Sequence, residues 1–540
     1  MAVEAASSIS RTLADGTALH HRAASGNSPP SSKASRPSRS NGGSPPGQAK
    51  VVKQGPHRVV WRVDLPSISF HLKKNLVPNW RARIRGWLRG PKARREYGLI
   101  DAVHERGIPT AQPLAWAERQ GESYLFTRTL EHVEPLHLFF LRTFQSCEDA
   151  TQTRIRQAIA CELGSLVAVM HQAGIDHRDL HAGNLLVRMG GERPRLFLID
   201  LDAVKLTGPL EGERRLASLA MLNAWFRLHA ERTDRLRFWK SYVAASPFLP
   251  WKKFGHDAVS MATALERRSA EYSLALWRGR EPRCLGQNRY YQKLSAGAAY
   301  GHAVRDVDPS LLATQRWNAR PTDAVLEPTE VDEGRHRWLP MADARSAKQA
   351  WKASQAFRER GLPTRKTLAV VVRNDGRGGQ LLTAHAEDAI PLARVSRHAK
   401  PLDRRYWIRR LANAYRDLHD RGVSWREPRL ESVLAAKADA RRDGWAYPEP
   451  LSLFPRAREG LWFADLAGMR LIKAMGESDR QRDLALLLVQ AADLSNADRL
   501  RFLRHYMRWG LQPKEDWKAW WGYIAANASG IAVSRSLETG

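Results

Sequence analysis

The chain has 540 residues and a mass of 61.0 kDa, with 86 lysines and arginines against 56 aspartates and glutamates and a formal net charge of +30. At about 150 residues per domain, this length predicts roughly three or four compact units. Hydrophobic residues make up 43% of the chain, which excludes global disorder, and no apolar run is long enough to cross a membrane. The three cysteines, Cys147, Cys161 and Cys284, are scattered, which excludes a disulfide framework or a thiolate zinc site and fits a reducing compartment.

The excess of positive charge leaves the class of partner open. A sequence pI near 10.5 favours polyanions, such as nucleic acid, an anionic membrane face or a phosphorylated glycolipid. An arginine-rich but otherwise ordinary surface explains the same charge, because net charge bears on association and not on fold. The first residues lack a basic segment followed by an apolar one, so we expect no secretory signal.

The first part of the chain differs in composition from the rest. Residues 1–50 are rich in Ser, Pro, Gly and Arg and nearly lack large apolar residues, so we expect a disordered tail. From Val51 onward the composition changes. Alternating apolar residues in 59–65 and 68–73 then predict half-buried strands.

Helical patterns dominate after these strands. Residues 92–106 predict a helix that ends at Gly107, and residues 153–173 predict a longer helix that ends at Gly174. A short apolar run at 196–199 follows, and mostly helical sequence continues to about residue 280. This order predicts a strand-rich part, one helix and a hinge, and then helices around a small insert of loops and strands.

Two segments of the first half recur in the second half in the same order. Residues 93–110 are echoed by residues 348–364, and residues 233–242 by residues 497–506, at similar separations. We therefore expect two tandem copies of one fold after the tail. Their predicted bounds are 51–283 and 284–540.

The segment from His177 through Asp179 to Asn184, followed by an apolar strand and Asp200, has the spacing H-R-D-x-x-x-x-N…D of a phosphoryl-transfer site. Phosphoryl transfer depends on positioning and charge neutralisation more than on covalent chemistry. Within this motif, Asp179 is the expected base for the hydroxyl group of the acceptor. Asn184 and Asp200 supply the hard oxygen ligands that Mg²⁺ on the phosphates requires.

This loop resembles that of the protein-kinase-like superfamily, and in detail the first copy resembles the lipopolysaccharide kinases, the Kdo/heptose (WaaP-like) family of bacterial core-sugar kinases. The resemblance covers about residues 52–283 and extends more weakly over the second copy. It rests on FHLKKN (70–75), RGPKARREYGLIDAVHERGIPTAQPLAW (89–116), HRDLHAGNLLV (177–187) and LFLIDLDAV (196–204). It implies the α+β, protein-kinase-like bilobal fold, with a β-rich N-lobe and a helical C-lobe, in two tandem copies. It also implies ATP and Mg²⁺ as cofactors.

The same resemblance assigns roles to residues outside the loop. Lys73 matches the lysine of the V-A-I-K strand and would bind the α- and β-phosphates, with Glu96 as its ion-pair partner. The alternatives are a solvated lysine at a strand end, with Lys74 next to it, and an exposed helix glutamate. His177 is grouped with Asp179 and Lys73 at the catalytic centre, where we expect it to brace the loop through hydrogen bonds rather than to exchange protons.

Two positions depart from the kinase pattern. No G-x-G-x-x-G loop precedes Lys73, and Gly55 is the one glycine at the first hairpin, so the sequence does not explain how the phosphates are covered. Asp202 occupies the glycine position of D-F-G. It is either a further metal ligand or part of a capped turn, and we favour the turn.

The second copy lacks most of these groups. In the alignment with the first copy, Glu327 stands opposite Lys73 and Ala350 opposite Glu96. Trp425-Arg426-Glu427 stand opposite the His-Arg-Asp triplet. Ser432 stands opposite Asn184, and Asp465 opposite Asp200. A carboxylate in place of the phosphate-binding cation reverses the charge there, and loss of the asparagine removes a metal ligand. We therefore expect a degenerate domain, a pseudokinase that packs, regulates or presents the acceptor, unless the alignment slips and another site exists there.

The sequence therefore predicts an ATP-dependent phosphotransferase with an alcohol group as acceptor, here a sugar hydroxyl of the lipopolysaccharide core or a related glycolipid. One alternative is a protein or small-molecule kinase, although the chain lacks an A-P-E segment as well as the glycine loop. An alternative of another class is a non-catalytic scaffold that binds polyanions. The expected partner is a phosphorylated glycolipid or sugar rather than nucleic acid. The expected location is the cytoplasm, with peripheral contact to the inner membrane as a further expectation.

Overall fold

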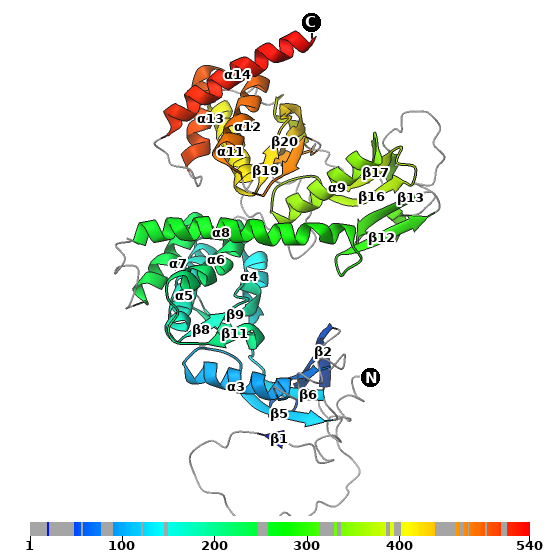
Figure 1. Ribbon diagram of the computed structural model, residues 1–540. Coiled ribbons are helices and arrows are strands. Elements are labelled where there is room, and N and C mark those ends of the chain that lie inside the picture. Colours follow the sequence, from blue (N-terminus) through cyan, green and yellow to red (C-terminus); the bar gives the residue numbers. More distant parts are fainter. Residues whose placement is uncertain are drawn as a thin grey trace, which may run out of the picture. The chain divides into compact units, whose positions relative to one another are not determined.

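The computed structural model of the chain is shown in Figure 1. The structure describes residues 19–20, 48–55, 58–76, 90–119, 122–144, 149–191, 193–246, 258–296, 299–312, 329–331, 336–384, 389–393, 401–437, 459–464, 466, 468–473, 475–491, 494–508 and 516–539. The predicted disordered tail lies outside these ranges except at its end and at two residues within it. Leu19–His20 form a short strand, and another strand begins at Gln48, because backbone pairing at a sheet needs no apolar side chains.

The chain divides into two compact units. The first comprises Met1–Phe140, Asp149–Ser218 and Glu231–Ala258, and the second comprises Leu141–Glu148, Leu219–Ala230 and Val259–Gly540. This division assigns helix α8 (Ala258–Arg280) to the second unit, whereas the repeat in the sequence places the boundary after residue 283. Within the described residues, no helix combines the length and the apolar character needed to span a bilayer.

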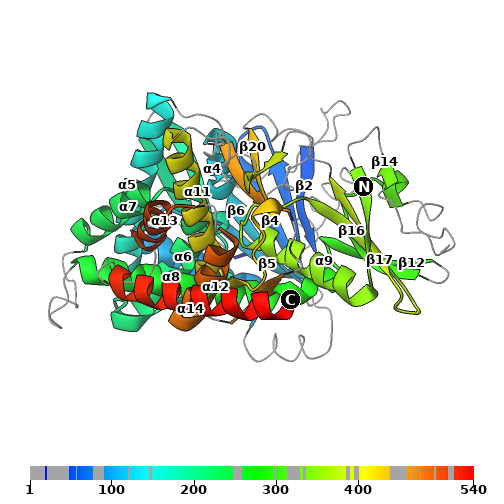
Figure 2. The same cartoon turned by 90° about the horizontal axis from the view of Figure 1, so that it is seen from above.

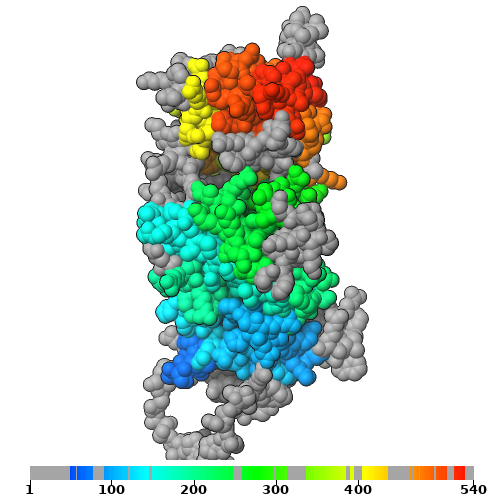
Figure 3. Space-filling view, turned by 90° about the vertical axis from the view of Figure 1, so that its left-hand side faces the viewer, coloured from blue at the N-terminus to red at the C-terminus, as the bar shows by residue number. Residues whose placement is uncertain are grey.

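The first unit begins with an antiparallel sheet of six strands. In spatial order these are β1 (Leu19–His20), β5 (Pro113–Arg119), β6 (Glu122–Arg128), β4 (Ser69–Asn75), β3 (Arg58–Asp64) and β2 (Gln48–Gly55). Helix α3 (Lys92–Glu105) packs against β5 and β6, and its arginines 94 and 95 are exposed. The blue residues around position 100 form part of the molecular surface in Figure 3. The two predicted strands and the first predicted helix are thereby confirmed.

Alternation along β4 separates an apolar face of this sheet from a polar one. Leu72 is 1% exposed and pairs across the strands with Phe126, in a core cluster that also contains Ala115 and Ala117. Lys73 is the next residue, so its side chain leaves the opposite face of the sheet. That face is the one from which Lys73 reaches α3.

Helices and short strands make up the rest of the first unit, which gives the bilobal order predicted for the first copy. Helix α5 (Ala150–Gln172) packs along α7 (Arg232–Ala244), as Figures 1 and 2 show. The close approach depends on Gly164, since a Cβ atom there would lie 2.4 Å from the carbonyl oxygen of Phe238. The other elements of the first unit are β7 (Glu134–Pro135), β8 (Ile175–His177), β9 (Leu185–Gly190), β10 (Arg193–Leu198) and β11 (Val204–Leu206). Helices α4 (Leu136–Thr143) and α6 (Gly212–His229) begin in the first unit, and the division assigns their residues from Leu141 and from Leu219 onward to the second.

The second unit also contains a sheet followed by a helix-rich part. After α8 come a six-stranded antiparallel sheet with one helix, α9 (Ala344–Glu359), and then a helix-rich part. In spatial order the sheet contains β12 (Tyr291–Ala296), β13 (Ala299–Val304), β16 (Thr367–Arg373), β17 (Gly379–Ala384), β15 (His336–Met341) and β14 (Thr329–Val331). The helix-rich part contains β18 (Ala389–Pro391), α11 (Pro401–Asp420), β19 (Val423–Trp425), β20 (Val433–Lys437), β21 (Glu459–Phe463), β22 (Met469–Leu471), α12 (Glu477–Gln490), α13 (Asn496–Arg508) and α14 (Trp517–Thr539).

Candidate functional site

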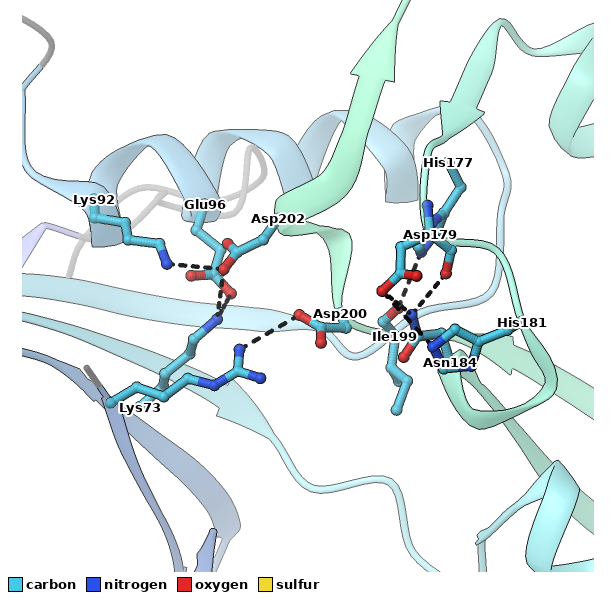
Figure 4. Close-up of polar contacts among 11 residues, drawn as sticks. Lys73, Lys92, Glu96, His177, Asp179, His181, Asn184, Ile199, Asp200 and Asp202 are labelled. Atoms are coloured by element: carbon cyan, nitrogen blue, oxygen red, sulfur yellow. Dashed lines mark hydrogen bonds and ion pairs between the residues drawn. The ribbon is translucent and has the colours of Figure 1, made fainter. Parts of the chain in front are cut away.

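The loop after β8 carries Asp179 and ends in a 3₁₀ turn, Ala182–Asn184 (Figure 4). Nδ2 of Asn184 donates a hydrogen bond of 2.8 Å to the backbone oxygen of Asp179 and lies 3.5 Å from its Oδ2. Asn184 is buried, whereas 61% of the Asp179 side chain is exposed. The amide nitrogen of Asn184 is therefore committed to the loop, which leaves its Oδ1 for another partner, while the Asp179 carboxylate is open to a substrate.

His177 joins the start of this loop to the segment that follows β10. Its Nδ1 accepts a hydrogen bond of 3.3 Å from the backbone nitrogen of Asp179, so the ring proton is on Nε2, which donates to the carbonyl oxygen of Ile199 over 3.3 Å. Burial lowers the pKa of His177, although the Ile199 carbonyl opposes this shift, so the ring is neutral. Both ring nitrogens are occupied, which is the bracing arrangement that the sequence predicted.

Asp200 is the second residue after β10, and its segment is held close to Asn184. The backbone nitrogen of Ile199 donates to the carbonyl oxygen of Asn184 over 3.0 Å, so the chain segment of Asp200 is tied to that of Asn184. Asp200 has φ 56° and ψ 56°, the left-handed conformation. This conformation is unfavourable for residues other than glycine, although aspartate tolerates it better than most, and backbone strain of this kind is concentrated at functional sites.

Lys73 and Glu96 form the ion pair that the resemblance implied (Figure 4). Lys73 Nζ lies 2.5 Å from Oε1 of Glu96, and their side chains are 13% and 7% exposed. Burial raises the pKa of Glu96 to about 7, although Lys73 opposes this shift. The alternatives of a solvated lysine and an exposed glutamate are therefore wrong, and Lys74 instead pairs with Glu122 on the neighbouring strand.

The carboxylate of Asp202 joins this ion pair, which differs from the capped turn that we favoured. Its Oδ2 lies 3.4 Å from Nζ of Lys73 and 2.9 Å from Nζ of Lys92 at the start of α3. Burial opposes ionisation of Asp202, but the two lysines lower its pKa to about 2. Because two ammonium groups already occupy this carboxylate, it is a poor candidate for a metal ligand.

Two polar residues near the site were missed by the sequence analysis. Arg58, the first residue of β3, places its Nη1 3.6 Å from Oδ1 of Asp200. His181 places its Nε2 3.7 Å from Oδ2 of Asp179, and its Nδ1 accepts from the backbone nitrogen of Gly183. His181 lies within the motif and was read only as a spacer, whereas nothing in the local sequence around Arg58 indicates its partner.

The donor atoms fit a magnesium ion that is shared with phosphates. The Oδ1 atom of Asn184 and the carboxylate of Asp200 are hard oxygen ligands on adjoining segments, and Mg²⁺ usually binds one or two such groups together with water and phosphate oxygens. In the described part of the chain, no group of three or more His, Cys, Asp or Glu side chains could hold a metal ion. A magnesium ion held by Asn184 and Asp200 would take its other ligands from water and phosphate oxygens.

Known proteins are similar to the part of the chain that contains this site. The sequence profile of the lipopolysaccharide kinase (Kdo/WaaP) family matches residues 59–242. The 3-deoxy-D-manno-octulosonic acid kinase of Xanthomonas campestris pv. campestris (strain B100) is 30% identical over 181 residues, which cover 32% of this chain and 68% of that protein. The chain belongs to the lipopolysaccharide kinase (Kdo/WaaP) family. It is therefore a kinase, as the spacing of the catalytic loop predicted.

Other members of this family match at lower identity. The 3-deoxy-D-manno-octulosonic acid kinase of Stenotrophomonas maltophilia (strain R551-3) is 28% identical over 211 residues, which cover 37% of this chain and 80% of that protein. The lipopolysaccharide core heptose(I) kinase WaaP of Pseudomonas aeruginosa is 23% identical over 236 residues, which cover 41% of this chain and 85% of that protein. A solved structure of WaaP in complex with acyl carrier protein aligns over 41% of this chain and 88% of that chain, at 23% identity and a TM-score of 0.32.

Two backbone contacts of the second unit resemble contacts of this site. The backbone nitrogen of Ala464 donates to the carbonyl oxygen of Ser432, as that of Ile199 does to Asn184. Trp425 pairs with Met469 as His177 pairs with Val204. These bonds support the alignment of Ser432 with Asn184 and of Trp425 with His177. Asp465, the predicted counterpart of Asp200, lies outside the described residues.

Glu327, the residue predicted opposite Lys73, lies outside the described residues. The strand registers offer a second way to compare the two sheets. In the first sheet Leu72 pairs with Phe126 and Lys73 with Leu125. In the second sheet Trp338 pairs with Leu382 and Leu339 with Leu381. If these two pairs of rows are matched, the apolar Leu339 is aligned with Lys73.

Proposed function

We propose that this kinase transfers the γ-phosphoryl group of ATP to a sugar hydroxyl of the lipopolysaccharide core or of a related glycolipid. The observation that carries the proposal is a set of contacts in a chain of this family. Lys73 pairs with Glu96 and also contacts Asp202, two residues after Asp200. The segment of Asp200 is in turn hydrogen-bonded to Asn184, which holds the loop of Asp179. The acceptor class is carried over from the printed names of relatives, which are kinases of 3-deoxy-D-manno-octulosonic acid and of a core heptose.

In this proposal, Asp179 activates the acceptor. Its exposed carboxylate accepts the proton of the attacking hydroxyl, and the hydrogen bond from Asn184 to its backbone holds the loop in place. The neutral ring of His177 fixes the loop against the segment of Ile199 and exchanges no proton. Because His181 lies beside Asp179, it is a positioning residue for the carboxylate.

Lys73 binds the α- and β-phosphates, and Glu96 and Asp202 direct its ammonium group. Asn184 and Asp200 would hold Mg²⁺, which when bound neutralises charge on the phosphates. Most of the work of the protein is therefore positioning and electrostatic stabilisation of the transferred group. Removal of one of these oxygen ligands should raise the barrier by several kcal/mol, on the order of a lost oxyanion-hole donor.

The positive charge of the chain supports an anionic acceptor. A net charge of +30 attracts a phosphorylated glycolipid and an anionic membrane face, the latter by roughly 1 kcal/mol for each Lys or Arg near the surface. We therefore propose action at the cytoplasmic face of the inner membrane, through peripheral contact.

We further propose that residues 284–540 form a degenerate copy of the same fold, a pseudokinase. Leu339, Ala350, Glu427 and Ser432 stand where the first copy has Lys73, Glu96, Asp179 and Asn184. This set offers neither the phosphate-binding cation nor the amide ligand. The proposed role of this copy is packing, regulation or presentation of the acceptor.

The test is phosphate mapping of envelope glycolipid from cells that carry the wild-type chain or Asp179→Ala. The proposal expects phosphate on a sugar of the glycolipid in the wild type and its loss in the variant. Phosphate on protein or on a soluble small molecule would support the alternative kinases instead. A wild-type chain with no ATP turnover at all would support the scaffold.

A further inference from the structure

Arg58 stands where a glycine-rich loop would cover the phosphates. It is the first residue of β3 and pairs across the hairpin with Gly55, the last residue of β2. On the next strand, Val60 pairs with Lys73 and Arg58 with Asn75. Because residues two apart on a strand share one face, Arg58 and Lys73 leave the same face of the sheet.

Both cations reach the segment that carries the two aspartates. Lys73 contacts Asp202, and Arg58 Nη1 lies 3.6 Å from Oδ1 of Asp200. Arg58 and Lys73, two positive side chains of this sheet face, therefore contact Asp200 and Asp202 respectively. Phosphates that share a metal ion with Asp200 would lie next to the guanidinium of Arg58.

We propose that Arg58 is a phosphate-binding residue of this kinase and replaces the backbone amides of the missing glycine-rich loop. This inference rests on the proposed use of ATP and adds a residue that lies just outside the family match, which begins at residue 59. A guanidinium group carries five N–H donors in a planar fork that fits phosphate oxygens, so one arginine at the hairpin can supply several hydrogen bonds.

The contacts of Arg58 show that its side chain is available for this role. Its pair with Asp200 is longer than a hydrogen bond, the two side chains are 28% and 32% exposed, and Asp200 is its one acidic partner within the described chain. By contrast, Lys73 is 13% exposed and held at 2.5 Å by Glu96. Exposed pairs of the first kind add little to stability, so Arg58 can exchange Asp200 for a phosphate at small cost.

The balance of charge favours that exchange. The site contains the carboxylates of Asp179, Asp200, Asp202 and Glu96, and the ammonium of Lys73 is already shared between two of them. When the carboxylate of Asp200 serves a metal ion, it no longer neutralises Arg58. A phosphate group is the anion that then stands within reach of the guanidinium.

The experiment measures nucleotide affinity on the full chain by isothermal titration calorimetry, with ATP and with adenosine as probes in the presence of Mg²⁺. The variants are Arg58→Ala and Arg58→Lys. Arg62→Ala is the matched control, because Arg62 lies on the same strand and face but pairs with Asp64 and Glu131. Arg58→Ala should weaken ATP binding about 10- to 100-fold and leave adenosine binding within about twofold. The ATP affinity of Arg58→Lys should lie between those of Arg58→Ala and the wild type. The ATP affinity of Arg62→Ala should equal that of the wild type.

Several results would overturn the inference. If Arg58→Ala binds ATP as tightly as the wild type or more tightly, Arg58 is only an ion-pair partner of Asp200 and does not bind phosphate. If it loses adenosine and ATP affinity equally, Arg58 supports the fold and not the phosphates. A wild-type chain that binds no ATP would contradict the proposed function itself. A chain that binds ATP through Arg58 but puts no phosphate on glycolipid would remove only the proposed acceptor.

Discussion

Lys73 and Glu96 join the sheet of the first unit to helix α3 through an ion pair of 2.5 Å that is almost closed to solvent. A buried carboxylate is favourable only while its partner cation remains in place. Burial raises the pKa of Glu96 to about 7, so near neutral pH the carboxyl group changes between a form that holds Lys73 and a form that does not. The competence of the phosphate site is therefore coupled to pH.

The first prediction concerns Glu96→Gln. Nucleotide affinity of the wild type should rise with pH through about 7, as Glu96 ionises and fixes Lys73, and the variant should show weaker binding without that rise. Stability should respond in the opposite direction. Since the folded pKa exceeds the ordinary value of 4.5, the contribution of Glu96 is full below pH 4.5 and is lost as pH rises to about 7, at most about 1.4 kcal/mol per pH unit. Urea unfolding and ATP titration between pH 4.5 and 8.5 measure both.

Glu122→Gln is the matched control for this prediction. Glu122 pairs with Lys74 at 2.7 Å on the neighbouring strand, but it is more exposed and its pKa lies below its ordinary value. This variant should keep the wild-type dependence of ATP affinity on pH. A rise in affinity through pH 7 that survives in Glu96→Gln would assign the titration to another group.

The catalytic loop could be predicted from sequence because its function depends on local spacing. His177, Asp179 and Asn184 lie within eight residues, and the hydrogen bonds that join them arise within one turn and its flanking strands. The pair of Lys73 and Glu96 was reached only through the resemblance. Strand alternation places Lys73 on one face of the sheet but does not say what lies opposite.

Sequence reasoning is weakest at positions that tertiary contacts decide. A constant offset along the repeat aligns Glu327 with Lys73, whereas the strand registers align Leu339 with it. The two alignments differ because fewer residues separate Leu339 from α9 than separate Lys73 from α3. Loops change length at little cost in free energy, whereas cross-strand pairs fix the register. Similarly, Asp202 looks like a turn residue locally, and only the folded chain brings Lys73 and Lys92 to it.

The second prediction compares Asp179→Asn with Glu427→Gln. Asp179→Asn should lower the rate of phosphoryl transfer about 10²- to 10⁴-fold, the usual contribution of a general base. Its side chain is 61% exposed, so the melting temperature should hardly change. Glu427, at the equivalent position of the second unit, should be replaceable with less than a twofold change. Equal losses in the two variants, measured by transfer of labelled phosphate from ATP, would contradict the proposal of one active and one degenerate copy.

The third prediction separates the conformation of Asp200 from its charge. Asp200→Asn and Asp200→Ala both remove the carboxylate, so both should weaken Mg²⁺-dependent ATP binding. Asparagine tolerates the left-handed conformation at φ 56°, whereas alanine does not, so only Asp200→Ala should also lose about 1 kcal/mol of stability. Chemical denaturation beside ATP titration tests this. Two variants of equal stability would show that the left-handed backbone carries no strain.

The fourth prediction concerns a buried pair that both units contain. His171 Nδ1 is hydrogen-bonded to the hydroxyl of Tyr242 over 2.9 Å, and His419 Nδ1 to that of Tyr506 over 2.6 Å. Tyr242→Phe and Tyr506→Phe should each leave a buried ring nitrogen unpaired, at a cost of about 1–3 kcal/mol, in the first and second unit respectively.

Saturating ATP distinguishes these two variants, because a ligand stabilises the folded unit that binds it. In calorimetric scans, ATP with Mg²⁺ should raise the temperature of the melting transition that Tyr242→Phe lowers. The temperature of the transition that Tyr506→Phe lowers should not change. Wild-type scans with and without ATP supply the reference for each transition. If ATP instead protects the transition that Tyr506→Phe lowers, the nucleotide binds the second unit, and the assignment of the phosphate site to Lys73 and Asp200 is wrong.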